Sequence, residues 1–255
     1  MKMTFDQYIQ NPMGVKNAVF SSREMYRNMY TVKLDAIMVR ESGKANYFLF
    51  KDNERYIALI KTPSENLDNF YYDVVIEFTP SGKKSQNSKT LNDYNVRFYS
   101  NDPHFVFTFM HAFLKNGMFF TDLSDKMSKE AIEQKAKEKN PNNMVGYVKS
   151  IFFAYLIMKR FSLFNKNRYI TNYNEKYLKS IITHSDDKIR DRQELQSQSA
   201  KKVRQEKIQK QKEEEIEKAK SKTLSSRSTR AINKVKTVGK TIKNTNRTKT
   251  TKIIK

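Results

Sequence analysis

Hydrophobic and polar residues alternate along residues 70–79 and 94–99, and two apolar stretches, residues 46–51 and 55–61, are separated by Asp52-Asn53-Glu54 in a hairpin pattern. The clearest alternation is at residues 70–79, where one face carries Phe70, Tyr72, Val74, Ile76 and Phe78, and the other carries Tyr71, Asp73, Val75, Glu77 and Thr79. A period of two is typical of an antiparallel strand with one buried face and one polar face. We therefore predict a four-stranded meander formed by residues 46–51, 55–61, 70–79 and 94–99.

Elsewhere, apolar residues recur at helical spacing between capping residues. Thr4-Phe5-Asp6-Gln7 has the form of a capping box, and Asn101-Asp102-Pro103 supplies a cap and a proline for a first helical turn. Residues 144–161 are apolar around most of the helical circumference, which predicts a buried central helix. The predicted helices are residues 4–10, 21–42, 103–116, 128–139, 144–161 and 175–184.

The composition changes at about residue 185. The 14 tyrosines, 17 phenylalanines and five prolines all precede it, and they supply enough apolar material for one sizeable core. Residues 186–220 are highly charged, and pairs such as Glu206 with Lys210 have the i,i+4 spacing that supports a helix. The predicted fold is an α+β head over residues 1–185, with a small antiparallel sheet of about four strands packed with helices. A charged solvent-exposed helix and a disordered basic tail, residues 221–255, follow it.

Positive charge is concentrated at the end of the chain. The net charge is +22, and half of it lies in the last 35 residues, which contain no Asp or Glu. A mobile arm of one sign can place its charges against successive phosphates and release their counterions, without reading the bases. We therefore predict non-specific nucleic-acid binding through phosphates, with Lys83, Lys84 and Arg97 of the head as further contacts. The cations of the arm are Lys222, Arg227, Arg230, Lys234, Lys236, Lys240, Lys243, Arg247, Lys249, Lys252 and Lys255.

Three other roles for the arm stay open. It can serve as a solubilising tail with no specific partner, or it can bind an acidic protein surface. A basic amphipathic helix that folds on a membrane surface or on a partner protein is the third. The residues near one helical face of such a helix, with lysines opposite, are Ile232, Val235, Val238 and Ile242.

The predicted sheet suggests a second class of function, a replication or transcription accessory protein that grips single strands. Aromatic side chains on a sheet can stack on bases while neighbouring cations follow the backbone. Tyrosines in such strands more often pack under a covering helix. The residues that would form this platform are Tyr71, Tyr99, Arg97, Lys83 and Lys84.

The sequence gives little support to an enzyme. Cys is absent, so neither a disulfide nor a thiolate metal site can form. His104 and His111 are separated by about 10 Å of helical rise, and Asp73 and Glu77 by about 13 Å of strand, so neither pair acts on one ion or one bond. Phosphate-binding glycine loops, HExxH and nucleophile elbows are missing. We predict no enzymatic activity, metal or cofactor, with a metal-dependent nuclease as the minor alternative.

Four strings of the sequence carry a resemblance to known proteins. They are residues 3–14 (MTFDQYIQNPMG), 70–78 (FYYDVVIEF), 99–109 (YSNDPHFVFTF) and 140–150 (NPNNMVGYVKS). These strings resemble a family of virion structural or otherwise uncharacterised proteins encoded by AT-rich bacteriophages of Gram-positive hosts. The resemblance covers most of the head and none of the tail, and it implies a phage assembly component with protein partners or a homo-oligomeric state.

The sequence also bears on localisation. The N-terminus is polar, and no uncharged apolar run is longer than residues 150–158. We therefore expect no signal peptide and no transmembrane segment, and a location in the host cytoplasm or the virion.

Overall fold

A computed structural model of the chain describes residues 2–10, 35, 46–64, 67–127, 140–146 and 148–247, with side chains as far as residue 218. Two units are distinguished, residues 1–196 and residues 197–255. The predicted helix at residues 128–139 lies outside the described residues, as does the helix at 21–42 except for Asp35.

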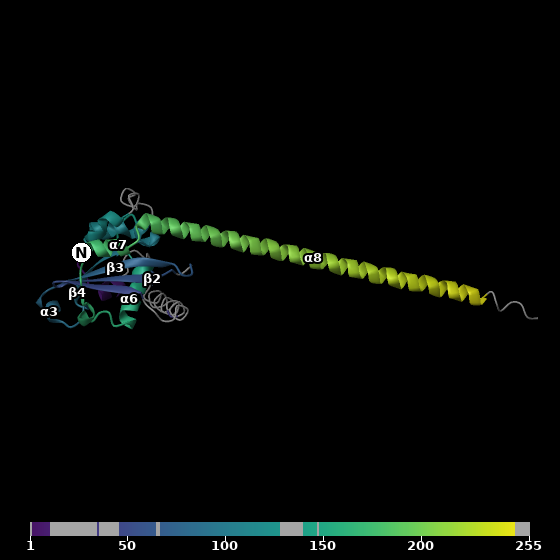
Figure 1. Ribbon diagram of the computed structural model, residues 1–255, viewed down its shortest axis with the longest axis horizontal. Coiled ribbons are helices and arrows are strands. Elements are labelled where there is room, and N and C mark those ends of the chain that lie inside the picture. Colours follow the sequence, from purple (N-terminus) through teal and green to yellow (C-terminus); the bar gives the residue numbers. More distant parts are fainter. Residues whose placement is uncertain are drawn as a thin grey trace, which may run out of the picture. The chain divides into compact units, whose positions relative to one another are not determined.

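The first unit is built on one five-stranded sheet, in the order β4-β3-β2-β1-β5 (Figure 1). The four strands of the predicted meander are confirmed, and each pairs antiparallel with its neighbour in the sequence. The fifth strand was missed, and it makes the sheet mixed, because it pairs parallel to β1 through Phe50 with Thr171 and Lys51 with Asn172. The strands are β1 (Tyr47–Asp52), β2 (Arg55–Pro63), β3 (Tyr71–Pro80), β4 (Tyr94–Ser100) and β5 (Thr171–Asn172).

One side of the sheet, which we call the apolar face, carries Tyr72, Val74, Ile76 and Phe78 of β3. The helices α1 (Phe5–Gln10) and α6 (Lys149–Arg160) pack on it. Phe5 of α1 lies 5.1 Å from the ring of Phe98 on β4 and 5.1 Å from the ring of Tyr155 on α6. The prediction of a buried α6 is confirmed, although the helix begins at Lys149 and not at residue 144.

The capping box at the start of α1 is formed as predicted. The backbone N–H of Thr4 donates to Oε1 of Gln7 at 2.8 Å, and the backbone N–H of Gln7 donates to Oγ1 of Thr4 at 3.2 Å. Two N–H groups that the helix leaves unpaired at its end are therefore satisfied by side chains.

The other side of the sheet, which we call the ion-pair face, carries Asp73, Val75 and Glu77 of β3. The sequence predicted this face to be polar and half-exposed, and that prediction is wrong. Asp73 is 1% exposed and Glu77 is 2% exposed, because η2 (Thr121–Lys126) and α7 (Glu175–Ile181) cover the face. Figure 1 shows α6 and α7 on opposite sides of the strands.

The outer edge of β4 is covered by two segments of irregular chain. The N–H of Val96 donates to the carbonyl of Met3 at 3.0 Å, and the N–H of Phe98 donates to the carbonyl of Met118 at 2.8 Å. The N–H of Phe120 returns to the carbonyl of Phe98 at 2.9 Å. Hydrogen-bonding groups that would otherwise be open to another strand are thus occupied.

The remaining short helices connect these layers. The predicted helix at 103–116 is divided into η1 (Phe105–Phe109), which is a π-helix, and α4 (Met110–Lys115). Gly117 lies two residues beyond the end of α4, and its φ of +68° is a conformation that glycine adopts without strain. Two further elements are α3 (Lys83–Asn87) and the 3₁₀ helix η3 (Lys166–Arg168).

The last element, α8, is a helix of 63 residues from Ser185 to Arg247 (Figure 1). The helix α8 runs through residues 221–247, a stretch for which the composition predicted disorder. This part of the chain has no proline, and Gly239 is its one glycine, so nothing in it forces a helix to end. Residues 248–255 lie outside the described part.

The helix α8 also has a favourable charge order. Asp186 and Asp187 lie in its first turn, and lysines and arginines follow toward its end. Negative charge near the N-terminus and positive charge near the C-terminus complement the helix dipole. No helix among the described residues combines the length and the apolar character needed to cross a membrane.

Candidate nucleic-acid interface

The predicted cations of the arm divide into two groups. Eight of them, from Lys222 to Arg247, lie within α8, and Lys249, Lys252 and Lys255 lie outside the described residues. The whole second unit, residues 197–255, has 19 Lys and Arg against five Glu and no Asp, a net charge of +14 out of +22. The charge segregation seen in the sequence therefore coincides with a structural unit.

The first part of α8 in this unit differs from the second. Every side chain of residues 197–218 is exposed. All five glutamates of the unit lie in this segment, among cations. Residues 221–247 have no acidic residue at all. One helix thus joins a segment of mixed charge to a segment of a single sign.

The three predicted contacts on the head are not brought together. Lys83 and Lys84 are exposed on α3. Arg97 lies on β4, on the ion-pair face, where its Nη1 is 3.3 Å from Oε2 of Glu77 and its side chain is 46% exposed. The charge of Arg97 is therefore already opposed by a carboxylate, and Arg97 does not belong to the same surface as Lys83 and Lys84.

The predicted stacking platform is not present as proposed. Tyr99 is fully buried, its ring lies 6.1 Å from that of Phe119, and its hydroxyl donates to the carbonyl of Lys126 at 3.1 Å. Burial raises the pKa of Tyr99. Tyr71 is half-buried. Because both faces of the sheet are covered, Tyr99 cannot stack on a base.

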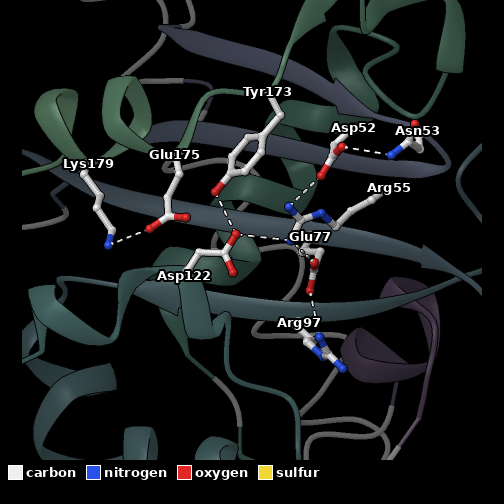
Figure 2. Close-up of polar contacts among 9 residues, drawn as sticks. All are labelled: Asp52, Asn53, Arg55, Glu77, Arg97, Asp122, Tyr173, Glu175 and Lys179. Atoms are coloured by element: carbon white, nitrogen blue, oxygen red, sulfur yellow. Dashed lines mark hydrogen bonds and ion pairs between the residues drawn. The ribbon is translucent and has the colours of Figure 1, made fainter.

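The ion-pair face contains a cluster that the sequence analysis missed, centred on Arg55 of β2 (Figure 2). The guanidinium of Arg55 contacts three carboxylates, Asp52 at 2.8 Å, Glu77 at 3.1 Å and Asp122 at 3.1 Å. We call these residues, with Arg97 and Tyr173, the Arg55 cluster. It joins the first hairpin of the sheet to the covering helix η2.

Tyr173 completes this cluster from above the sheet. Its hydroxyl donates to Oδ2 of Asp122 at 2.7 Å, and its ring centre lies 4.8 Å from Cζ of Arg55, a cation–π contact. Burial, followed by the hydrogen bond to Asp122, raises the pKa of Tyr173. Burial by itself would lower the pKa of Arg55. The hydrogen bonds to Asp52 and Glu77 outweigh this effect, so the pKa of Arg55 is raised above its ordinary value.

A second group on the same face is centred on Asp73. Its Oδ1 accepts from Nζ of Lys61 at 2.5 Å, and its Oδ2 accepts from Nδ2 of Asn101 at 2.9 Å and from the backbone N–H of Thr183 at 3.0 Å. Lys61 also donates to the carbonyl of Ile181 at 3.1 Å. Asp73 therefore fastens the chain between α7 and α8 to the middle of the sheet.

These groups are internally satisfied, and this decides what they can do. Each oxygen of Glu77 accepts from a different arginine, and each oxygen of Asp73 has a donor. Among the described residues, no three His, Cys, Asp or Glu side chains are placed to hold a metal ion. The arrangement supports a structural role for the buried charges.

A register argument could have found both groups from the sequence. Lys61 is directly opposite Asp73 in the β2–β3 pair, and Glu77 is directly opposite Arg97 in the β3–β4 pair. Opposite charges at facing positions stabilise an antiparallel pair. The contribution of Asp122 had no such signal, because it comes from a helix 45 residues beyond Glu77.

Comparison with protein-family models, with curated proteins and with solved structures found no match for this chain.

Proposed function

We propose that this protein binds nucleic acid non-specifically through phosphates, using the basic end of α8, and that it is a non-enzymatic structural or assembly protein. The observation that supports the proposal is the single-signed segment at residues 221–247, which has eight cations and no carboxylate. Lysine and arginine on such a segment have no partner of opposite charge within it, so their binding energy is available to an external polyanion.

The expected binding mode follows from counterion release. A duplex presents one negative charge per about 1.7 Å, and each phosphate neutralised by a cation changes the slope of log K against log salt by about −0.9. If about eight cations are engaged, the slope is about −7. Contacts of this kind position a protein on the backbone and carry no sequence information.

The setting that we propose is a virion or its assembly in a phage-infected cell. The support for it is the resemblance of the head to virion structural proteins of AT-rich phages. In this setting the head makes protein contacts with partners or with further copies of the chain, and the basic segment holds the genome.

The test uses the full-length chain and two matched variants. In the first, the eight cations at positions 222, 227, 230, 234, 236, 240, 243 and 247 are changed to Gln. In the second, eight cations upstream in the same helix, at positions 201, 202, 204, 207, 210, 212, 218 and 220, are changed to Gln. Both variants lose the same charge, and Gln is a good helix former.

We expect the first variant to lose most of its affinity for duplex DNA and most of its salt slope. The second should lose much less, because the replaced cations lie among five glutamates that already oppose part of their charge. The measurement is a fluorescence anisotropy titration with labelled duplex and single-stranded DNA at several salt concentrations. Equal losses in the two variants would contradict the assignment to residues 221–247.

Binding to anionic vesicles tests the alternative that this segment is an amphipathic helix on a membrane surface. The helical state of residues 232–242 in α8 is the observation that keeps this alternative in the experiment. Tight binding to vesicles with weak binding to DNA would replace a nucleic-acid partner by a membrane surface.

A further inference from the structure

We propose that the head has its own phosphate-binding surface for the backbone of nucleic acid, formed where α3 meets the loop that follows α6. The inference rests on the proposed function, and it adds a second binding surface that belongs to the folded head alone. We call it the α3 surface, and its cations are Lys83, Lys84, Lys89, Lys166 and Arg168.

Backbone hydrogen bonds bring the two segments of the α3 surface together. The N–H of Leu91 donates to the carbonyl of Phe164 at 2.8 Å, and the N–H of Lys166 donates to the carbonyl of Lys89 at 3.2 Å. Thr90 and Asn165 form an antiparallel bridge between them. Cations that are more than 75 residues apart in the sequence therefore share one surface.

Two of these cations are held by neutral acceptors. Nζ of Lys166 donates to the carbonyls of Ser85 at 3.1 Å and Gln86 at 2.8 Å. Arg168 donates to the carbonyl of Phe161 at 3.2 Å and to the hydroxyl of Tyr47 at 2.8 Å. A carbonyl or hydroxyl orients a cation without cancelling its charge, so both residues still contribute to a positive potential.

The other three cations are exposed side chains. Lys83, Lys84 and Lys89 have no ion pair with a residue in the described part of the chain. Lys83 and Lys84 are consecutive on α3, and Lys89 follows the helix by two residues. They can reach phosphates without first breaking such a pair.

Few carboxylates of the described residues lie around the α3 surface. The two segments that form it belong to stretches without Asp or Glu, residues 78–92 and 140–174. Glu54 accepts a hydrogen bond from Nε2 of Gln86 at 2.6 Å. The backbone carbonyl of Asp93 accepts a hydrogen bond from the hydroxyl of Ser81 at 2.6 Å. Within the described part of the chain, the five cations of the surface thus lie near two carboxylates, whereas the Arg55 cluster has two cations and three carboxylates.

A rigid base supports the surface. Nζ of Lys166 lies 4.7 Å from the ring centre of Tyr94 and 5.7 Å from that of Tyr56, and both rings are buried. Cations on a fixed base meet the phosphates in one geometry, so the head would hold the nucleic-acid backbone in a defined register on its own surface.

The first test is lysine footprinting on the full-length protein with acetylation and mass spectrometry, with and without duplex DNA. We expect DNA to protect Lys83, Lys84 and Lys89. The internal controls are Lys115, Lys126 and Lys176, which belong to α4, η2 and α7. Equal protection of the two sets would overturn the proposal.

The second test is a matched pair of triple variants in the full-length chain. Changing Lys83, Lys84 and Lys89 to Gln should make the salt slope shallower by about 2.7, at about 0.9 for each phosphate contact. Between 50 and 200 mM salt, the affinity of the unchanged protein should then fall about 40-fold more than that of the variant. The control changes Lys115, Lys126 and Lys176 to Gln and should keep the original slope.

The outcomes separate this inference from the proposed function. If the α3 variant binds like its control while neutralisation of residues 222–247 abolishes binding, the α3 surface is overturned and the proposed function stands. If the α3 variant loses its slope while that neutralisation has no effect, the α3 surface stands and the role of α8 is overturned. A Lys-to-Arg version of the triple variant should bind normally, which shows that charge and not folding is responsible.

Discussion

The two faces of the sheet are made by alternate residues of the same strands, yet they are stabilised in different ways. On the apolar face, Phe5, Phe98 and Tyr155 pack ring against ring. On the ion-pair face, Asp73 and Glu77 are equally buried, but each is held by cations from neighbouring strands. These two carboxylates are thus as deeply buried as the rings of the other face, and only the interactions that stabilise the buried groups differ.

The difference suggests that one face contributes mainly to stability and the other mainly to strand register. Aromatic burial supplies free energy without a demanding geometry. A buried ion pair adds little net stability, since the cost of removing the charges from water offsets their attraction. We infer that the pairs define register, because a slip of one residue would turn Asp73 or Glu77 toward the apolar face.

The largest expected effect comes from the apolar face. Phe98→Ala should lower the free energy of unfolding of the head by about 3–5 kcal/mol, since it leaves a cavity among fully buried rings. Urea unfolding followed by tyrosine fluorescence is the suitable measurement, because all tyrosines lie at or before Tyr177. Ile170→Ala is the control, as Ile170 is 86% exposed. A loss below 1 kcal/mol at position 98 would show that the ring packing is not decisive.

The ion-pair face should respond nearly as strongly when one partner alone is removed. Asp73→Asn should cost about 3 kcal/mol, because Lys61 then keeps its charge beside a neutral amide. The exposed Asp93→Asn has the same chemical change and should stay within about 0.5 kcal/mol. If the two variants unfold at the same urea concentration, the buried pair does not hold the face as we describe.

Alkaline pH should weaken both faces through their buried tyrosines. Burial raises the pKa of Tyr8 on the apolar face and of Tyr99 on the ion-pair face. The free energy of unfolding is unaffected by these groups below the ordinary tyrosine pKa of about 10, where they are protonated in both states. Above that pH it declines by about 1.4 kcal/mol per pH unit for each group, because the unfolded chain loses the proton first. Urea unfolding between pH 9 and 11.5 measures the slope. Tyr99→Phe should reduce it by one tyrosine's share, and an unchanged slope would contradict this.

The smallest expected effect comes from removing one of two tyrosine hydroxyls that lie on or beside the apolar face. The hydroxyl of Tyr8 donates to the carbonyl of Gly146 at 2.8 Å, so Tyr8→Phe leaves a buried acceptor and should cost about 1 kcal/mol. The hydroxyl of Tyr169 is buried and has no hydrogen-bond partner among the residues that the structure describes, so Tyr169→Phe should be neutral or slightly stabilising. Thermal unfolding of the two variants side by side tests this, and a destabilised Tyr169→Phe would show that its hydroxyl has a partner.

The sequence alone determined the elements that depend on neighbouring residues. Alternation located β3 and β4, the hairpin pattern located β1 and β2, and the capping box located α1. The run of cations located the single-signed segment at residues 221–247, but not its helical state. These features are local, because strand periodicity, N-terminal capping and electrostatic repulsion act between residues a few positions apart.

Tertiary structure decided which polar residues are inside. The alternation at residues 70–79 could not show that Asp73 and Glu77 are buried, since burial depends on η2 and α7, which come much later in the chain. The parallel strand β5 has two residues and no pattern of its own. The α3 surface also needed the fold, because hydrogen bonds between residues 89–91 and 164–166 create it. Contacts of this kind are set by packing over long sequence separations, and no local pattern encodes them.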